Sequence, residues 1–291
     1  MSTALHSLPA GWVGTLVPST GSTNADLAAA GRSGAPHGTV LAADEQTAGR
    51  GRLGRRWVSP AGTAVAVSVL LRPPVEESSW TWLPLLAGLA VSDALRELAP
   101  SLATVLKWPN DVLTAAGTTD GEAKLAGILS EHVGPGGADR PGVVVGIGLN
   151  VTVPAASFPP DAHATSLAAA GAAGAALDRD LLLRTILAAL HSRYSSWSSE
   201  SGSAGWSSES ESASGSGSGS SAGAAGDVAR DYRARCATIG RRVRVQVGGG
   251  GATVVGVATG IAADGALLVA APDATTTAVH AGDVHHLRGS R

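Results

Sequence analysis

Apolar residues recur along the first two thirds of the chain in two spacings, one typical of β-strands and the other typical of α-helices. Short runs of Val, Ile, Leu and Ala, bounded by glycine, proline or polar clusters, predict strands. These runs are residues 39–43, 64–71, 105–113, 124–131 and 143–153. Apolar positions three and four apart predict helices. They occur at residues 80–98 and 178–194, and a capped helix start is expected at residues 23–26.

The pattern changes after residue 194. Residues 195–226 consist of Ser, Gly, Ala and Glu with two tryptophans, and such a composition buries too little apolar area to offset its ordering entropy, so we predict a flexible insert. A short helix is expected at residues 227–236, and the Val-, Gly- and Thr-rich remainder predicts a small antiparallel β barrel. We therefore expect an α+β protein with two domains, residues 1–236 and 237–291.

Composition narrows the possible functions. The formal net charge is −2, which argues against a nucleic-acid-binding protein, because these usually present a basic face. The single cysteine, Cys236, cannot form an internal disulfide and fits a reducing compartment. The N-terminus lacks the charged and apolar segments of a signal peptide, and no run approaches the ~20 apolar residues of a membrane span. A soluble cytoplasmic protein is expected.

Lysine is rare in this chain, which contains only Lys107 and Lys124. Arginine does not replace the compact charge of a lysine ammonium, so the two retained lysines are candidates for chemistry. Lys124 lies within an apolar run, where an ammonium is costly unless it meets an anion. For Lys107, a strand-edge position facing solvent is the alternative, and Asn110 and Asp111 close by are also typical of an Asx turn.

The densest motif is Gly-Arg-Gly-Arg-Leu-Gly-Arg-Arg-Trp at residues 49–57, here called the arginine–glycine loop. It contains Gly-x-Gly-x-x-Gly, but Ser-Pro-Ala-Gly at residues 59–62 cannot begin the helix that a dinucleotide-binding fingerprint requires, so we reject that interpretation. A glycine loop with several guanidinium groups suits closure over a reaction between a carboxylate and a phosphate. An exposed basic loop without a specific ligand is the alternative.

These motifs stand in an order and spacing that resemble biotin protein ligases. The resemblance covers roughly residues 15–288 apart from the insert. It implies a mixed sheet with helices, similar to class II aminoacyl-tRNA synthetases, followed by a small SH3-like β barrel. The segments that carry it are residues 22–24, 49–57, 107–112, 124–129, 146–151 and 165–167.

The resemblance implies a ligase that forms a C–N bond in two steps. Biotin and ATP would give biotinyl-5′-AMP and pyrophosphate, and the biotinyl group would then pass to a lysine of the biotin carboxyl carrier domain of an acyl-CoA carboxylase. Mg²⁺ would arrive with ATP, and no protein-held metal is expected. Because only about twenty residues precede Ser22, we expect no DNA-binding domain. A monomer or weak homodimer without membrane association is expected.

The resemblance also implies roles for individual residues. The expected catalytic residues are Lys124, Arg52 and Asp111. The expected biotin-binding residues are Ser22, Thr23, Asn24, Gln46, Gly49, Arg50, Arg52 and Lys124. The expected ATP- or adenylate-binding residues are Arg52, Arg55, Trp57, Lys124 and Asn150. From the residues alone, residues 22–24 are equally interpreted as a helix cap, and Asn150 as a turn residue at a strand end.

Two other functions fit parts of this pattern. A lipoate-type ligase has the same fold and adenylate chemistry, but the complete arginine–glycine loop and residues 107–111 favour biotin. A non-catalytic biotin-binding protein is the second alternative, and the presence of Lys124 and Arg52 argues against lost activity.

Overall fold

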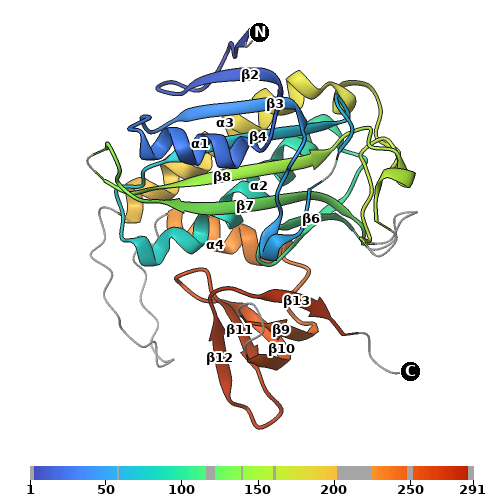
Figure 1. The fold of residues 1–291 in the computed structure, drawn as a ribbon. Helices are drawn as coiled ribbons and strands as arrows, with labels where there is room; N and C mark the ends of the chain where they lie inside the picture. The colour runs from blue at the N-terminus through green and yellow to red at the C-terminus, as the bar shows by residue number, and fades with distance from the viewer. Residues whose placement is uncertain are drawn as a thin grey trace.

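The computed structural model describes residues 3–57, 59–115, 122–138, 140–159, 162–201, 224–247 and 252–287. Within these residues the chain forms a large mixed sheet with helices and a separate antiparallel sheet near the C-terminus (Figure 1). This arrangement confirms the predicted α+β fold class, and the C-terminal sheet is consistent with an SH3-like module.

The large sheet contains eight strands, of which β2 and β3 run parallel while the other neighbours pair antiparallel. In spatial order its strands are β1 Thr3–Ala4, β2 Val13–Thr20, β3 Thr39–Gln46, β4 Ala64–Leu71, β8 Gly142–Asn150, β7 Lys124–Val133, β6 Asp111–Thr114 and β5 Thr104–Lys107. The longest pairings, β4 with β8 and β8 with β7, form the middle of the sheet. This middle provides a rigid floor for side chains that project from the strands.

Helices cover both faces of this sheet. They are α1 Thr23–Arg32, α2 Trp82–Leu98, α3 Arg179–Ser201 and α4 Ala224–Arg235, with short 3₁₀ segments at Arg52–Gly54, Glu77–Thr81, Ala155–Ser157 and Gly174–Leu177. Leu70 of β4 packs in a cluster with α1, whereas Val69 and Leu71 pack in the main core with α2 and α3. Successive strand residues face opposite sides, so β4 is buried along its whole length and is apolar apart from one serine.

The prediction of one strand at residues 105–113 was wrong. The structure forms two antiparallel strands, β5 and β6, joined by a tight turn in which Asn110 N donates to Lys107 O at 3.1 Å. Pro109 lacks the N–H that a ladder requires and restricts Trp108, so the apolar run cannot continue as one strand. The turn directs Asn110 and Asp111 toward the neighbouring strand β7.

The start of the predicted insert was also wrong, because α3 continues to Ser201. Trp197 is buried and packs near Tyr194, with ring centroids 6.0 Å apart, which anchors the additional turn against the core. Helix α4 begins at Ala224, within the end of the predicted insert. The rest of the insert, residues 202–223, lies outside the described residues.

The C-terminal sheet is antiparallel and has five strands within the described part of the chain. In spatial order they are β12 Thr276–Val279, β11 Leu267–Ala270, β10 Thr253–Ile261, β9 Arg242–Gln246 and β13 Asp283–His286. Two buried indoles join it to the rest of the molecule: Trp108 Nε1 donates to Gly265 O at 3.0 Å, and Trp82 Nε1 donates to Ala263 O at 2.7 Å. Among the described helices, none has the length and apolar character needed to cross a membrane.

Candidate active site

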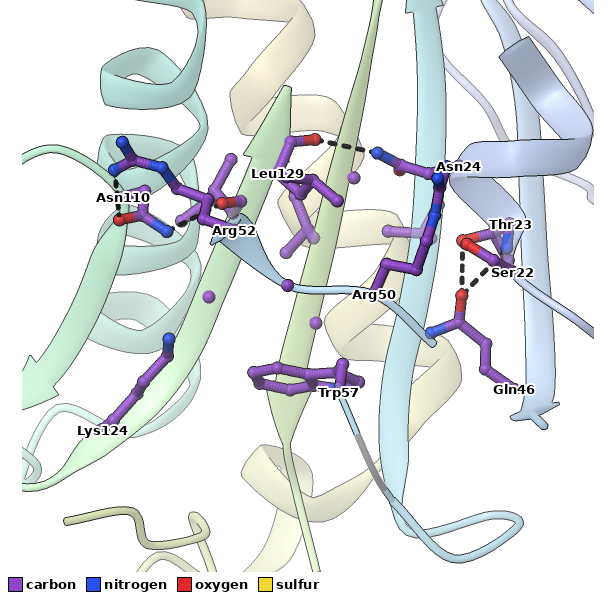
Figure 2. A pocket seen from close by; sticks show the side chains of 17 residues that line it. Ser22, Thr23, Asn24, Gln46, Arg50, Arg52, Trp57, Asn110, Lys124 and Leu129 are labelled. Atoms are coloured by element: carbon purple, nitrogen blue, oxygen red, sulfur yellow. Dashed lines mark hydrogen bonds between the residues drawn. The ribbon is translucent and has the colours of Figure 1, made fainter. Parts of the chain in front are cut away.

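A pocket opens over the middle of the large sheet, beneath the arginine–glycine loop (Figure 2). Its empty space, including the open mouth, is about 450 Å³. Its walls are formed by Ser22, Thr23, Asn24, Gln46, Arg50, Gly51, Arg52, Trp57, Val67, Asn110, Lys124, Gly127, Ile128, Leu129, Gly146, Ile147 and Gly148. Side chains from distant parts of the sequence therefore meet in one cavity.

One end of the pocket is formed by uncharged polar side chains, with the Arg50–Glu131 ion pair at its edge. Ser22 caps α1, its Oγ accepting from Ala25 N at 3.4 Å, and the first turn of the helix then presents Thr23 and Asn24. Gln46 Oε1 accepts from Thr23 N at 2.9 Å and from Thr23 Oγ1 at 3.1 Å. Residues 22–24 therefore form both the start of helix α1 and a wall of the pocket.

Ser68 of β4 supports this polar end from below. It is fully buried, and its Oγ lies 2.8 Å from Thr23 Oγ1 and 2.6 Å from Asn24 Oδ1. Ser68 was not among the predicted site residues. Its signal was a single hydroxyl in an otherwise apolar strand, which is costly to bury unless the group is hydrogen-bonded.

The opposite end of the pocket is cationic. Lys124 Nζ lies 2.6 Å from Asp111 Oδ1 and 5.7 Å from the centroid of the Trp57 ring. Arg52 Nη1 donates to Asn110 Oδ1 at 3.1 Å, and Asn110 Nδ2 donates to Ile128 O at 3.0 Å. Figure 2 shows this end on the side away from Asn24 and Gln46. The cavity is therefore built for a ligand with a neutral polar head and an anionic tail.

Burial lowers the pKa of the Arg52 guanidinium, while the carboxylates of Asp111 and Asp283 act in the opposite direction. An arginine with a somewhat lowered pKa is still a cation at neutral pH. A partly desolvated guanidinium beside a cavity attracts an incoming anion more strongly than an exposed one, because less water screens it.

The arginine–glycine loop is held at two further points. Arg50 Nη2 lies 2.8 Å from Glu131 Oε1, and Arg55 Nη2 lies 2.8 Å from Asp283 Oδ2 on β13. Burial by itself would raise the pKa of Asp283, but the Arg55 guanidinium lowers it below the ordinary value. Together with the Arg52–Asn110 contact, three arginines connect the loop to three different elements.

Glycines form the floor under Trp57. A Cβ atom at Gly148 would lie 2.6 Å from Trp57 Cε2, and one at Gly127 would lie 3.1 Å from Trp57 Cζ3. At Gly146, a Cβ would collide with the Asn24 side-chain oxygen. These glycines leave room for the side chains of the pocket, so the close approach here is between backbone and side chain.

The structure brings most of the predicted site residues into the pocket wall. Those that line it are Ser22, Thr23, Asn24, Gln46, Arg50, Arg52, Trp57 and Lys124. Asp111 touches the site through Lys124, and Gly49 O accepts from Trp57 N at 2.9 Å. Two predicted residues point elsewhere: Arg55 contacts the C-terminal sheet, and buried Asn150 donates from Nδ2 to Thr165 O at 3.0 Å.

Besides Ser68, two residues with polar side chains in or beside the pocket were not among the predicted ones. Asn110 lines the pocket and binds Arg52, and Glu131 binds Arg50 at the pocket edge. Asn110 lies in the motif at residues 107–112 and Glu131 ends the predicted strand at residues 124–131, but their partners are in the arginine–glycine loop, far away in sequence. Within the described part of the chain, no group of three His, Cys, Asp or Glu side chains is placed to hold a metal ion.

Family models and known relatives match this chain over most of its length. Residues 14–150 match the model of the biotin/lipoate A/B protein ligase family, and residues 238–287 match the biotin protein ligase C-terminal domain. The biotin–[acetyl-CoA-carboxylase] ligase of Mycobacterium tuberculosis is 42% identical over 277 residues, covering 94% of this chain and 88% of the relative. A ligase of the same name from Paracoccus denitrificans is 43% identical over 135 residues, covering 45% of this chain and 52% of the relative.

Solved structures show the same fold. The biotin protein ligase from Aquifex aeolicus in complex with biotin and ATP superposes with a TM-score of 0.69 and 25% identity, over 95% of this chain and 99% of that chain. The match runs through both the large sheet and the C-terminal sheet. On the identity to the mycobacterial enzyme and the two family matches, the chain belongs to the biotin protein ligase family.

Proposed function

We propose that this protein is a biotin–[acetyl-CoA-carboxylase] ligase, which activates biotin with ATP and transfers it to a lysine of a carboxylase carrier domain. One observation carries the proposal: a single pocket joins a neutral hydrogen-bonding end to a cationic end. Biotin has the matching shape, a neutral ureido ring at one end and a carboxylate at the other. The name of the mycobacterial relative supports the carboxylase as the protein that is modified.

Biotin would bind with its ureido ring at the polar end, among Ser22, Thr23, Asn24 and Gln46. Because Gln46 Oε1 already accepts two hydrogen bonds from Thr23, its Nε2 amide is left to donate to the ureido oxygen. The apolar chain of biotin would lie over the middle of the sheet. Its carboxylate would then reach Lys124 and Arg52.

The first reaction joins two anions. A biotin carboxylate oxygen attacks the α-phosphorus of ATP, the bond from that phosphorus to the bridging β-phosphate oxygen breaks, and pyrophosphate leaves. Lys124 and Arg52 reduce the repulsion between carboxylate and phosphate and stabilise charge that grows on the non-bridging oxygens, where one fixed donor is worth about 3 kcal/mol. Mg²⁺ enters as part of the nucleotide substrate.

In the second reaction, the amine of the carrier lysine attacks the acyl carbon of biotinyl-5′-AMP. The amide bond forms as the bond from the acyl carbon to the phosphate oxygen breaks, AMP leaves with the electron pair of that bond, and the amine releases its proton to solvent. Asp111 is the carboxylate beside this position and pairs with Lys124 at 2.6 Å. We assign it the role of orienting Lys124 and receiving the attacking amine.

The loop and its neighbours complete the nucleotide side. Trp57 would pack against adenine, and Arg55 would exchange Asp283 for a phosphate when ATP binds. Asn150 would support this side indirectly, since it holds the segment at Thr165. A closed loop excludes water from the mixed anhydride, which otherwise hydrolyses.

Several parts of the proposal extend beyond the site. We propose a division into a catalytic domain, residues 1–236, and a C-terminal β domain, residues 237–291. A cytoplasmic location, a monomer or weak homodimer, and the lack of specific operator binding also belong to the proposal. Specific binding of the purified protein to operator DNA would contradict the last of these.

The deciding experiment is ATP–pyrophosphate exchange with the purified protein, with biotin, lipoate and octanoate as parallel substrates. Exchange that depends on biotin alone is expected. Exchange with lipoate instead would identify a lipoate-type ligase, and exchange with none of the three acids would leave a non-catalytic binding protein. Transfer to a biotin carboxyl carrier domain is then measured with labelled biotin.

A further inference from the structure

Glu131 lies at the edge of the pocket, on β7, and joins two parts of the site. Its Oε1 accepts from Arg50 Nη2 at 2.8 Å, and its Oε2 accepts from Arg50 Nη2 at 3.0 Å and from Asn24 Nδ2 at 2.9 Å. Arg50 belongs to the arginine–glycine loop, and Asn24 to the first turn of α1. The Glu131 carboxylate thus binds both the arginine–glycine loop and the wall of the pocket.

Both Nδ2 hydrogens and the Oδ1 atom of Asn24 have hydrogen-bond partners. Its second Nδ2 hydrogen goes to Leu129 O at 3.0 Å, and its Oδ1 lies 2.6 Å from the buried hydroxyl of Ser68. Asn24 itself is buried, so leaving any of these groups unpaired would cost free energy. The hydrogen bond from Asn24 therefore orients the Glu131 carboxylate, so that both of its oxygens face Arg50.

We propose that Glu131 is a positioning residue that holds Arg50, and with it the arginine–glycine loop, over the biotin end of the pocket. This inference rests on the proposed function and assigns a role to a residue outside the pocket wall. An ion pair between two freely moving surface side chains contributes little, because ordering them costs entropy. Here the hydrogen bond from Asn24 already orders the Glu131 side chain. Pairing with Arg50 therefore costs Glu131 little further side-chain entropy, and the ion pair stabilises the closed position of the loop.

The loop contacts predict different roles for the three arginines. Arg52 and Arg55 attach the loop at its nucleotide side, through Asn110 and Asp283, and Arg50 attaches it at the biotin side. Loss of the Glu131 charge therefore opens the biotin side first. Bound adenylate should then escape faster, although the groups that form it remain in place.

The first test measures loop opening without any ligand. Trypsin cleaves after arginine, and the loop offers Arg52, Arg55 and Arg56 as sites beyond Arg50. In Glu131→Gln, cleavage within the loop should rise about fivefold, which corresponds to about 1 kcal/mol for a partly exposed pair. The matched control is Glu77→Gln, which removes an exposed pair with His132. His132 follows Glu131 on β7, and its side chain therefore points to the opposite face of the sheet.

The same substitution in an Arg50→Gln variant tests whether Glu131 acts through Arg50. In Arg50→Gln protein the loop should already be cleaved faster, and adding Glu131→Gln should change the rate no further. An additional increase of the same size in the double variant would show that Glu131 acts without Arg50 and would overturn the proposal. So would cleavage of Glu131→Gln at the rate of the Glu77→Gln control, or an equal increase at sites throughout the chain.

The second test measures retention of the product of the first reaction. Biotinyl-5′-AMP should dissociate from Glu131→Gln about fivefold faster than from the unaltered protein, while kcat for pyrophosphate exchange stays close to its original value. Glu131→Ala also removes the Asn24 contact and should raise the KM for biotin. Unchanged retention in both variants would overturn the inference. Absence of biotin-dependent exchange in the unaltered protein would refute the proposed function, and the ligand-free trypsin test would still decide the loop contact.

Discussion

The ammonium of Lys124 lies 2.6 Å from the carboxylate of Asp111, on the adjacent strand β6, and faces the Trp57 ring at 5.7 Å. This contact resolves the problem posed by a lysine in an apolar strand, because the charge is paired and remains only partly exposed. It also places an anion next to the group that would bind the biotin carboxylate. A bound substrate must therefore compete with Asp111 or share Lys124 with it.

Lys124→Ala should abolish adenylate formation. Loss of one fixed donor at a developing anionic charge lowers kcat by about 10²–10³-fold, and no second lysine is near enough to substitute for it in the described part of the pocket. Pyrophosphate exchange measures the effect, and thermal unfolding verifies that the variant is folded. Arg230→Ala, which removes an exposed cation on α4, serves as the control. Exchange near the original rate in Lys124→Ala would refute its assigned role.

Arg52→Gly should loosen retention of the adenylate. The change removes the contact with Asn110 and adds backbone freedom to the loop, so biotinyl-5′-AMP should leave the site and label nearby proteins indiscriminately. Labelled biotin in a mixture of carrier domain and an unrelated protein measures this. Arg56→Gly is the matched control in the same loop, because the exposed Arg56 side chain has no partner among the described residues. Labelling confined to the carrier would contradict this account of the loop.

Two glycine substitutions should separate the ends of the pocket. Gly146→Ala places a methyl group against Asn24 and should raise the KM for biotin about tenfold. Gly148→Ala places one 2.6 Å from the Trp57 ring and should raise the KM for ATP instead. Initial rates with each substrate varied in turn provide the measurement. If both variants changed the same KM, the proposed orientation of the two substrates would be wrong.

Asp93 joins α2 to two other helices. Its carboxylate lies 2.5 Å from Arg193 Nε on α3 and 2.7 Å from Arg235 Nη1 on α4. Burial alone would raise the pKa of Asp93, but the hydrogen bonds from Arg193 and Arg235 lower it below its ordinary value. Asp93→Asn should therefore reduce the free energy of unfolding at pH 7, by about 3 kcal/mol, because two partly buried guanidinium groups lose the charge of their nearer carboxylate and keep only Asp231, at 3.2 and 3.8 Å.

The pH dependence of this contribution follows from the direction of the pKa shift. Because the pKa of Asp93 is lower in the folded state, its carboxylate contributes its full stabilisation at pH values above the unfolded-state pKa of about 3.9. This contribution is lost as the pH falls through the folded-state pKa. The difference in unfolding free energy between the original protein and Asp93→Asn should be constant from pH 7 to about 5 and should shrink below about 4. Denaturant titrations at several pH values measure it. A difference that stayed constant into this acidic range would contradict the ion-pair interpretation.

The sequence predicted those features that depend on near neighbours. Alternating and continuous apolar runs located β3, β4, β7 and β8 closely, and the helix start expected at residues 23–26 is present, with Ser22 as its N-cap. The single strand expected at residues 105–113 was wrong, because Pro109 turns the chain inside an apolar run. The insert was expected to begin at residue 195, but α3 continues to Ser201, because its serine-rich end is held by the tertiary packing of Trp197 and not by helix propensity.

By itself, the sequence determined the types of residue available for chemistry, their order along the chain and the family to which they point. Only the tertiary structure decided which of them meet. Glu131 is 81 residues from Arg50, and Asp283 is farther still from Arg55, so no local periodicity can pair them. Strand order and register bring such side chains together, and these depend on burying both faces of the sheet at once. The same burial explains why Ser68, hidden in an apolar strand, supports the site from below.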